Sequence, residues 1–169
     1  MIVRNKIWDE IVHADANAIC ARKYANVQRR IQMFYLISVP LLSAVCVLLT
    51  KLQLYNETVW TALFIFVSSL IKAVFPRIVL PEKDILELDK LFQDFSEYYG
   101  KLEDLWFRYE KNVISEEDAE KEVVAIGKSN VKKKKALNKL VLWIPKYIDN
   151  RITKESEQHL NPIFNNKYE

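Results

Sequence analysis

The chain has 169 residues, of which 50% are hydrophobic and 28% are charged, with two Gly, two Cys and a formal net charge of +3. This composition excludes collagen-like, low-complexity and disulfide-scaffold proteins, and a mean hydropathy of −0.09 is typical of a soluble helical domain. The average hides two regions, because only 4 of the 50 residues from 31 to 80 are charged, against 43 of the other 119.

The N-terminal segment, residues 1–30, contains neither Gly nor Pro and is predicted to be a cytoplasmic helix that can continue into the apolar region. Small and aliphatic residues recur every three or four positions along it and give a narrow face suited to close helix packing. The expected partner of this face is the long helix that follows the apolar region.

Residues 31–80 are predicted to form a two-transmembrane hairpin. Residues 31–50 carry no charge and, as a helix, would cover about 30 Å, the thickness of a bilayer core. Residues 58–76 are interrupted only by Lys72, which lies one turn from the end, where its side chain can reach the headgroups. The alternative is a buried core hairpin of a soluble bundle.

Positive charge predicts the orientation of the two spans. Arg22, Lys23, Arg29 and Arg30 precede the first span, whereas the loop between the spans offers only Lys51. Lys72, Arg77 and Lys83 lie at or after the end of the second span, so both termini are expected in the cytoplasm. Cys20 and Cys46 would then lie in reducing cytoplasm and in the bilayer, where a structural disulfide is not expected.

Each predicted span carries a stripe of small or polar residues on one face. Two interpretations remain open: these residues form contacts between helices, which we favour, or they line a pore in an assembly of several hairpins. Pro40 lies within the first span and predicts a kink. The stripe residues are Gln32, Ser43, Cys46, Thr50, Thr58, Thr61, Ser68, Ser69 and Lys72.

Residues 81–169 are predicted to form a cytoplasmic helical region, beginning with one helix from about Pro81 or Asp84 to about Asn112. Its apolar residues alternate at spacings of three and four over 25 residues, as in a coiled coil. The broad aromatic face favours a helical bundle or an oligomeric seam. The seam residues are Ile85, Leu88, Phe92, Phe95, Tyr99, Leu102, Trp106 and Tyr109.

Three shorter helices are predicted after this one. Ser115 and Asp118 have the spacing of a capping box, so a helix is expected to start there and to end at Gly127 or Ser129. A further helix from about Val131 is expected to end before Pro145, and a last one before Pro162.

A cluster of six lysines lies in the C-terminal part of the chain. It has three open interpretations: a face that pairs with the acidic helix before it, which we favour; a surface for anionic lipid, with Leu142 and Trp143 in the interface; or a site for nucleic acid or a nucleotide messenger. The run lacks Arg and interleaved aromatic residues, so direct nucleic-acid binding is not expected. The lysines are Lys128, Lys132, Lys133, Lys134, Lys135 and Lys139.

The sequence shows no Gly-rich phosphate loop, no metal-ligand spacing and no nucleophile with an adjacent base. His13 and His159 are far apart in the sequence, without a carboxylate arrangement to match, and are expected to be surface or packing residues. The sequence therefore predicts a protein that is not an enzyme and needs no cofactor or metal.

The order of parts is a basic N-terminal helix, two closely spaced spans, the aromatic helix LELDKLFQDFSEYYGKLEDLWFRYE and a further helical hairpin. Over about residues 5–165 this order resembles the SLATT superfamily, the two-transmembrane effector domains associated with SMODS and SLOG proteins in bacterial conflict systems. The resemblance implies an all-α membrane protein with a two-transmembrane helical hairpin and a cytoplasmic bundle or coiled-coil-like region.

The resemblance also implies a function. It points to a homo-oligomeric effector of anti-phage defence in the bacterial inner membrane, which forms a pore or disrupts the membrane and kills or arrests the cell. A regulatory partner protein or a nucleotide second messenger would trigger it, and membrane lipid would be its other partner. The alternatives are a membrane-anchored adaptor that carries a helical interaction surface and a holin-like protein.

Overall fold

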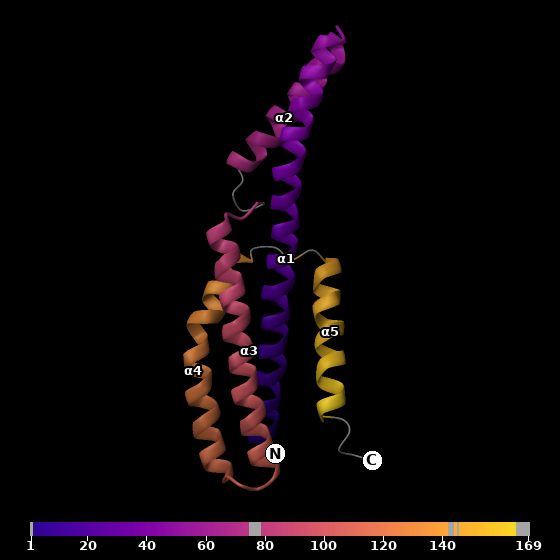
Figure 1. The fold of residues 1–169 in the computed structure, drawn as a ribbon. Coiled ribbons are helices and arrows are strands. Elements are labelled where there is room, and N and C mark those ends of the chain that lie inside the picture. Colours follow the sequence, from indigo (N-terminus) through magenta and orange to yellow (C-terminus); the bar gives the residue numbers. More distant parts are fainter. Residues whose placement is uncertain (1, 75–78, 142–143, 145, 165–169) are drawn as a thin grey trace. The chain divides into compact units, whose positions relative to one another are not determined.

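The computed structural model describes residues 2–74, 79–141, 144 and 146–164. Within these residues the chain is helical and has no strand, which confirms the all-α class (Figure 1). The helices are α1 (Ile2–Lys51), α2 (Tyr55–Val74), α3 (Glu82–Glu110), α4 (Glu116–Leu140) and α5 (Lys146–Phe164).

The chain divides into two compact units. The first, here called the bundle, combines Met1–Ala25 with Leu86–Glu169. The second, here called the apolar unit, is Asn26–Ile85. Helix α1 belongs to both, since the N-terminal segment and the first apolar stretch form one helix of 50 residues, with Pro40 inside it. The kink predicted at Pro40 stays a prediction.

Two of the helices end in the same hydrogen-bonded motif, although neither end has a glycine. After α1, Gln53 adopts a positive φ of 59°, and Leu54 N donates to Leu49 O at 3.0 Å. After α3, Asn112 has a φ of 54°, and Val113 N donates to Arg108 O at 2.9 Å. These are Schellman ends, in which a left-handed residue turns the chain while its neighbour satisfies a free carbonyl.

The helix start predicted at Ser115 is confirmed. Ser115 is the N-cap, its hydroxyl accepts from Asp118 N at 3.1 Å, and the same hydroxyl donates to the Asp118 carboxylate at 2.7 Å. These bonds satisfy a backbone donor that the first turn of a helix leaves free.

The predicted break at Gly127 or Ser129 is wrong, because α4 continues to Leu140. Gly127 keeps a helical backbone, and a Cβ there would come no closer than 3.9 Å to the Tyr98 hydroxyl. Burial of Val123 and Leu137 on either side holds the helix together across the glycine.

The predicted stop before Pro162 is also wrong, since α5 continues to Phe164. A proline that close to the C-terminus of a helix removes one hydrogen bond and interrupts no long run of turns. Pro145, before which the preceding helix was expected to end, lies outside the described residues, as do Leu142 and Trp143.

The core of the bundle is formed by α1, α3, α4 and α5. Ile7, Ile11 and Leu102 are 0% exposed and belong to one apolar cluster that also includes Val123 of α4 and Leu160 of α5. The N-terminal part of α1 therefore packs on α3, as predicted, and Figure 1 shows these two helices side by side. The rings of Trp8 and Trp106 join them, with centroids 5.8 Å apart.

The apolar unit has the opposite character. No residue from 29 to 70 is buried. In the part of the chain that the structure describes, α1 is the helix long and apolar enough to cross a membrane by length and composition, and none of its most apolar window is buried. The second predicted span ends among residues 75–78, outside the described residues, and its crossing stays a prediction.

Candidate functional site

A belt of exposed apolar side chains, here called the apolar belt, lies on α1, α2 and the turn between them. Soluble monomers rarely expose contiguous apolar patches of more than a few hundred Å². The belt is therefore the first candidate for a functional surface. Its members, each at least 37% exposed, are Met33, Phe34, Leu36, Ile37, Leu41, Val45, Val47, Leu48, Leu52, Leu54, Tyr55, Val59, Trp60, Leu63, Phe64, Phe66, Val67 and Leu70.

Hydroxyl groups within the belt are satisfied by their own helices. Ser43 donates to Val39 O at 2.8 Å, and Thr50 donates to Cys46 O at 2.9 Å. On α2, Thr58 and Thr61 donate in the same way to the carbonyl four residues earlier, each at 2.8 Å. These four hydroxyls therefore need no water and can face lipid without leaving an unpaired donor at their own positions.

The polar stripe predicted on the two spans divides into two groups. Cys46, Thr58, Thr61 and Ser68 are partly covered, and the Cys46 thiol donates to Thr58 O at 3.7 Å across the two helices. Ser43, Thr50 and Ser69 are exposed. The partly covered group occupies positions suited to helix contact, whereas a pore-lining role for either group stays a prediction. The Lys72 side chain lies outside the described residues.

Gln32 has a structural role that the stripe did not predict. Its amide donates to Leu80 O at 2.6 Å, and Gln28, one turn earlier on α1, accepts from Leu80 N at 3.1 Å. Gln28 is 3% exposed, and Val79 and Leu80 are also buried. Two glutamines of α1 thus hold both backbone groups of Leu80, just before α3 begins.

The predicted seam of α3 lies mostly inside this one chain. Ile85, Leu88, Phe95, Leu102 and Trp106 are buried, and Phe92, Tyr99 and Tyr109 are partly covered. Much of this aromatic face is already used for packing within the chain. Self-association through it stays a prediction.

The lysine cluster also divides into two groups. Lys133 pairs with Asp94 of α3 at 3.2 Å, and Lys134 pairs with Glu10 of α1 at 3.3 Å. Of the three interpretations of the cluster, the favoured one, pairing with the acidic helix, thus applies to Lys133. Lys128, Lys132, Lys135 and Lys139 are exposed instead.

Glu10 lies in a polar cluster between three helices. It accepts a hydrogen bond from the Tyr98 hydroxyl of α3 at 2.7 Å and pairs with Lys134 of α4. Burial by itself would raise the pKa of Glu10, but the bond from Tyr98 and the charge of Lys134 outweigh it, so the pKa lies below its ordinary value. Burial and the Glu10 carboxylate raise the pKa of Tyr98.

Asp15 and His159 form a pair that sequence reasoning missed. They are 144 residues apart, yet His159 Nδ1 lies 2.8 Å from Asp15 Oδ1 in a contact between α1 and α5. The Asp15 side chain is 7% exposed and that of His159 is 49% exposed. The position of Asp15 on the small-residue face of α1 could have indicated that it has a polar partner, because a carboxylate that faces a core needs one.

The pair lies in a pocket of about 450 Å³ between α1, α3 and α5, which is also lined by Arg22, Phe92, Ser96, Tyr99 and Glu155. The ring of Tyr99 lies 5.4 Å from that of His159, and burial together with the charges of Glu103 and Asp15 raises the pKa of Tyr99. Ser96 donates to Phe92 O at 2.9 Å. The hydroxyl is thus engaged by its own helix.

Helix α5 is fastened to α1 at a second point. The Glu155 carboxylate forms ion pairs with both Arg22 and Lys23. The hydrogen bond from Lys23 and the two positive charges lower the pKa of Glu155. The described residues contain no group of three His, Cys, Asp or Glu side chains arranged to hold a metal ion.

Both cysteines of the described chain are free. Burial, with a smaller contribution from Asp149, raises the pKa of the Cys20 thiol to about 11. A buried thiol in this state is a packing residue, since the thiolate is the reactive form.

The bundle thus holds two polar clusters, and the apolar unit presents the apolar belt. No protein-family model matches the chain, and no curated protein or solved structure shows significant similarity to it.

Proposed function

We propose that this chain is a membrane-embedded effector whose apolar unit lies in a bilayer as a two-span hairpin, with both termini on the cytoplasmic side. The observation that carries the proposal is the apolar belt: no residue from 29 to 70 is buried, although most of the side chains there are apolar. Exposing one large apolar side chain to water costs about 1.5–3 kcal/mol, so lipid is the solvent that suits this surface.

The effector half of the proposal is that several copies associate in the inner membrane of a bacterium and permeabilise it when a partner protein or a nucleotide signal acts on the bundle. The resemblance to SLATT domains supports this step. So does the presence of Ser43, Thr50 and Ser69 on exposed faces of the two helices, where an assembly can turn them toward water. Since much of the seam of α3 packs within the chain, the copies would meet through the apolar unit.

A membrane adaptor is the second candidate, and one observation favours it. Ser43, Thr50, Thr58 and Thr61 already bond to their own helices, so nothing at these positions requires water. In this case the hairpin only holds the bundle at the membrane, and binding of a partner to the bundle is the whole function.

Release of an encapsulated dye from vesicles that contain the full chain separates the two candidates. An effector releases dye, and Ser43→Leu combined with Ser69→Leu lowers the release severalfold, because the polar face is removed while the apolar belt is kept. Ser96→Leu is the matched control, since Ser96 is an exposed serine of the bundle with the same bond to its own helix.

Expression in growing bacteria gives the second readout. The effector predicts loss of membrane potential and arrest of growth when the chain is activated, and the serine double variant reduces both. Intact vesicles and normal growth under resting and activated conditions contradict the effector and leave the adaptor.

A further inference from the structure

Four lysines of α4 lie on one face of the helix. Lys128, Lys132, Lys135 and Lys139 are spaced by four, three and four residues, which places them within a narrow angle of one another on a helix with 3.6 residues per turn. The row is about 16 Å long at 1.5 Å per residue. We call these four residues the lysine row.

The lysine row is not neutralised by its own helix. Lys121, two turns before the row on the same face, pairs with Glu117 at 2.7 Å. Beyond it, residues 123–148 contain no acidic residue. Lys133 and Lys134, which lie between members of the row, point inward to Asp94 and Glu10. The positive charge of the row is thus directed away from the bundle, and all four of its members are exposed.

Contacts within the bundle show toward which end the row runs. Arg108 of α3 pairs with Glu122 of α4, and Lys133 of α4 pairs with Asp94 of α3, so the two helices are antiparallel. Arg4 of α1 pairs with Glu110 at 2.7 Å, and Arg22 lies over the Phe92 ring at 5.6 Å, so α1 and α3 are antiparallel as well.

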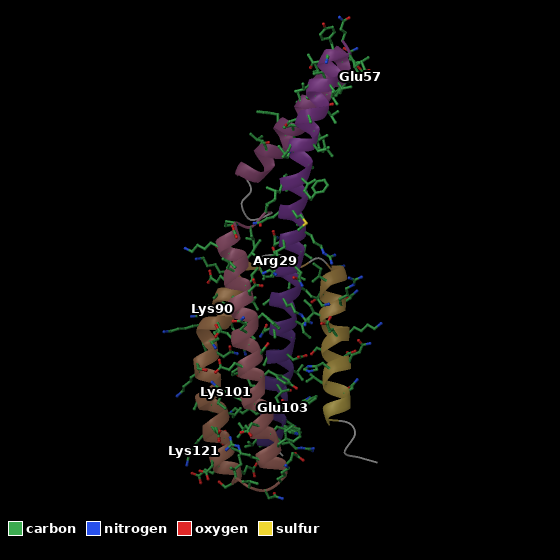
Figure 2. The ribbon with its side chains drawn as sticks, in the orientation of Figure 1. Arg29, Glu57, Lys90, Lys101, Glu103 and Lys121 are labelled. Atoms are coloured by element: carbon green, nitrogen blue, oxygen red, sulfur yellow. The ribbon has the colours of Figure 1, made fainter. Side chains whose placement is uncertain are left out.

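These pairings place three features at one end of the bundle. Ala25 and Leu86, where the chain passes to and from the apolar unit, lie at the end that also carries the C-terminus of α4. The turn between α3 and α4 lies at the opposite end, near Lys121, which Figure 2 labels. The lysine row therefore runs toward the end of the bundle where the chain passes to the apolar unit.

We propose that the lysine row binds the headgroups of anionic lipids in the membrane that holds the apolar unit. The inference rests on the proposed membrane location. Lysine is a compact charge that suits a surface of many phosphates without fixed geometry, and juxtamembrane lysines attract anionic leaflets. The Lys139 end of the row lies toward the end of the bundle where the chain passes to the apolar unit, so a negatively charged leaflet there would attract the row.

Amine labelling of the full chain in vesicles tests the proposal. The chain is reconstituted in neutral phosphatidylcholine vesicles and in vesicles with 30% phosphatidylglycerol, and a water-soluble amine reagent is followed by mass spectrometry. The anionic lipid lowers the labelling rate of the four row lysines by about fivefold relative to Lys121 and Lys101 in the same molecules. Because the charges are at a surface, 0.5 M NaCl restores the rate.

Paired variants sharpen the result. Lys132→Gln with Lys135→Gln reduces the protection of Lys128 and Lys139, because half of the attracting charge is gone. Lys111→Gln with Lys154→Gln is the matched control and leaves the protection unchanged, since it removes the same charge at exposed positions elsewhere on the bundle and keeps both reference lysines. Both variants remain in the membrane after carbonate extraction.

The outcomes separate the two proposals. Equal labelling in neutral and anionic vesicles, in a chain that resists carbonate extraction, overturns lipid binding by the row and leaves the membrane location intact. Equal protection in both kinds of vesicle also overturns it, because protein and not anionic lipid then covers the row. Release of the chain by carbonate overturns the membrane location and the inference with it.

Discussion

The two halves of α1 are parts of one continuous helix, yet their apolar side chains are buried in the first half and exposed in the second. Ile7, Ile11 and Ala14 in the bundle are 0% exposed, whereas Leu36 and Val47 in the apolar unit are 75% and 69% exposed. The hydrophobic character of a side chain therefore does not by itself predict whether that side chain is buried. The first half is covered by three other helices of the chain, and the second half presents its side chains to whatever surrounds the molecule.

Polar groups show the same contrast. In the bundle they pair across helices, as Glu10 does with Tyr98 and Asp15 with His159. In the belt, hydroxyls such as that of Ser43 bond to the helix that carries them. The polar groups named in the bundle thus find partners on other helices, whereas the belt hydroxyl finds its partner on its own helix.

The largest effect is expected when the same substitution is made at two phenylalanines and the stability of the bundle is compared. Phe95 of the bundle is 0% exposed and Phe66 of the belt is 62% exposed. Phe95→Ala leaves a cavity and lowers the stability of the bundle by about 3–5 kcal/mol. Phe66→Ala leaves the unfolding of the bundle unchanged. Tryptophan fluorescence measures both, because the rings of Trp8 and Trp106 lie against each other at the core of the bundle. Equal losses of stability in the two variants would contradict the contrast.

A charge on the belt is the next largest effect. Leu41 is 62% exposed on α1 and Leu86 is 59% exposed on α3. Leu41→Arg places a charge at the middle of the predicted span, which costs about 2.5–3.5 kcal/mol of insertion, and the carbonate-resistant fraction falls. Leu86→Arg has no such effect. If Leu41→Arg leaves the membrane-bound fraction unchanged, the belt does not face lipid.

A smaller effect is expected within the apolar unit when the Gln28 side chain is replaced. Gln28→Leu removes the acceptor of the buried Leu80 amide, and an unsatisfied buried donor costs about 1–3 kcal/mol. Faster hydrogen exchange at the Leu80 amide measures the loss. Gln93→Leu, on an exposed position of α3, serves as the control. Unchanged exchange in the Gln28 variant would show that the two glutamines do not hold this segment.

Acid weakens the bundle through Glu10. Its pKa in the folded chain lies below the ordinary value of 4.5, so the carboxylate stabilises the bundle above that value. This stabilisation is lost as the pH falls through the lowered pKa. Glu10→Gln lowers the thermal stability of the bundle by about 1 kcal/mol at pH 7, and the difference from the wild type is smaller at pH 3. A difference that is the same at both pH values would rule out the carboxylate as the cause.

The smallest expected effect is a gain. Gly100 lies inside α3, and a Cβ there would have nothing within 4 Å. Gly100→Ala therefore stabilises the bundle by up to about 1 kcal/mol, because alanine loses less conformational entropy in a helix. A higher midpoint of thermal unfolding is the readout, and a lower midpoint would show that the site has no room.

Helix type was predictable from the sequence, because apolar spacing and the lack of turn residues act locally. The capping box at Ser115 was readable for the same reason. The end of α4 was not predictable in this way. A glycine such as Gly127 ends a helix only when no tertiary packing holds the helix together, and here the buried Val123 and Leu137 on either side hold it. The small-residue face of α1 predicted close packing, but its partner, α3, was only an expectation until the fold brought the two helices together.

The polar pairs of the candidate sites were harder to predict. Asp15 and His159 are 144 residues apart in the sequence, and no local pattern links them. The six lysines look alike in sequence, and only the rotation of α4 in the bundle directs Lys133 and Lys134 inward and the other four outward. Periodicity shows which residues share a face, but the partner of each face is decided by the fold.

Quenching of a fluorophore by lipid tests the central claim most directly. A bimane label is placed singly at Leu36, Val47 or Phe64 of the belt and at Lys121 of the bundle, with Cys20 and Cys46 replaced by Ser, and the full chain is reconstituted. Nitroxides on the lipid acyl chains quench the three belt labels strongly, and iodide in the water quenches only the label at Lys121. Quenching of the belt labels by iodide and not by the lipid nitroxides would contradict the account.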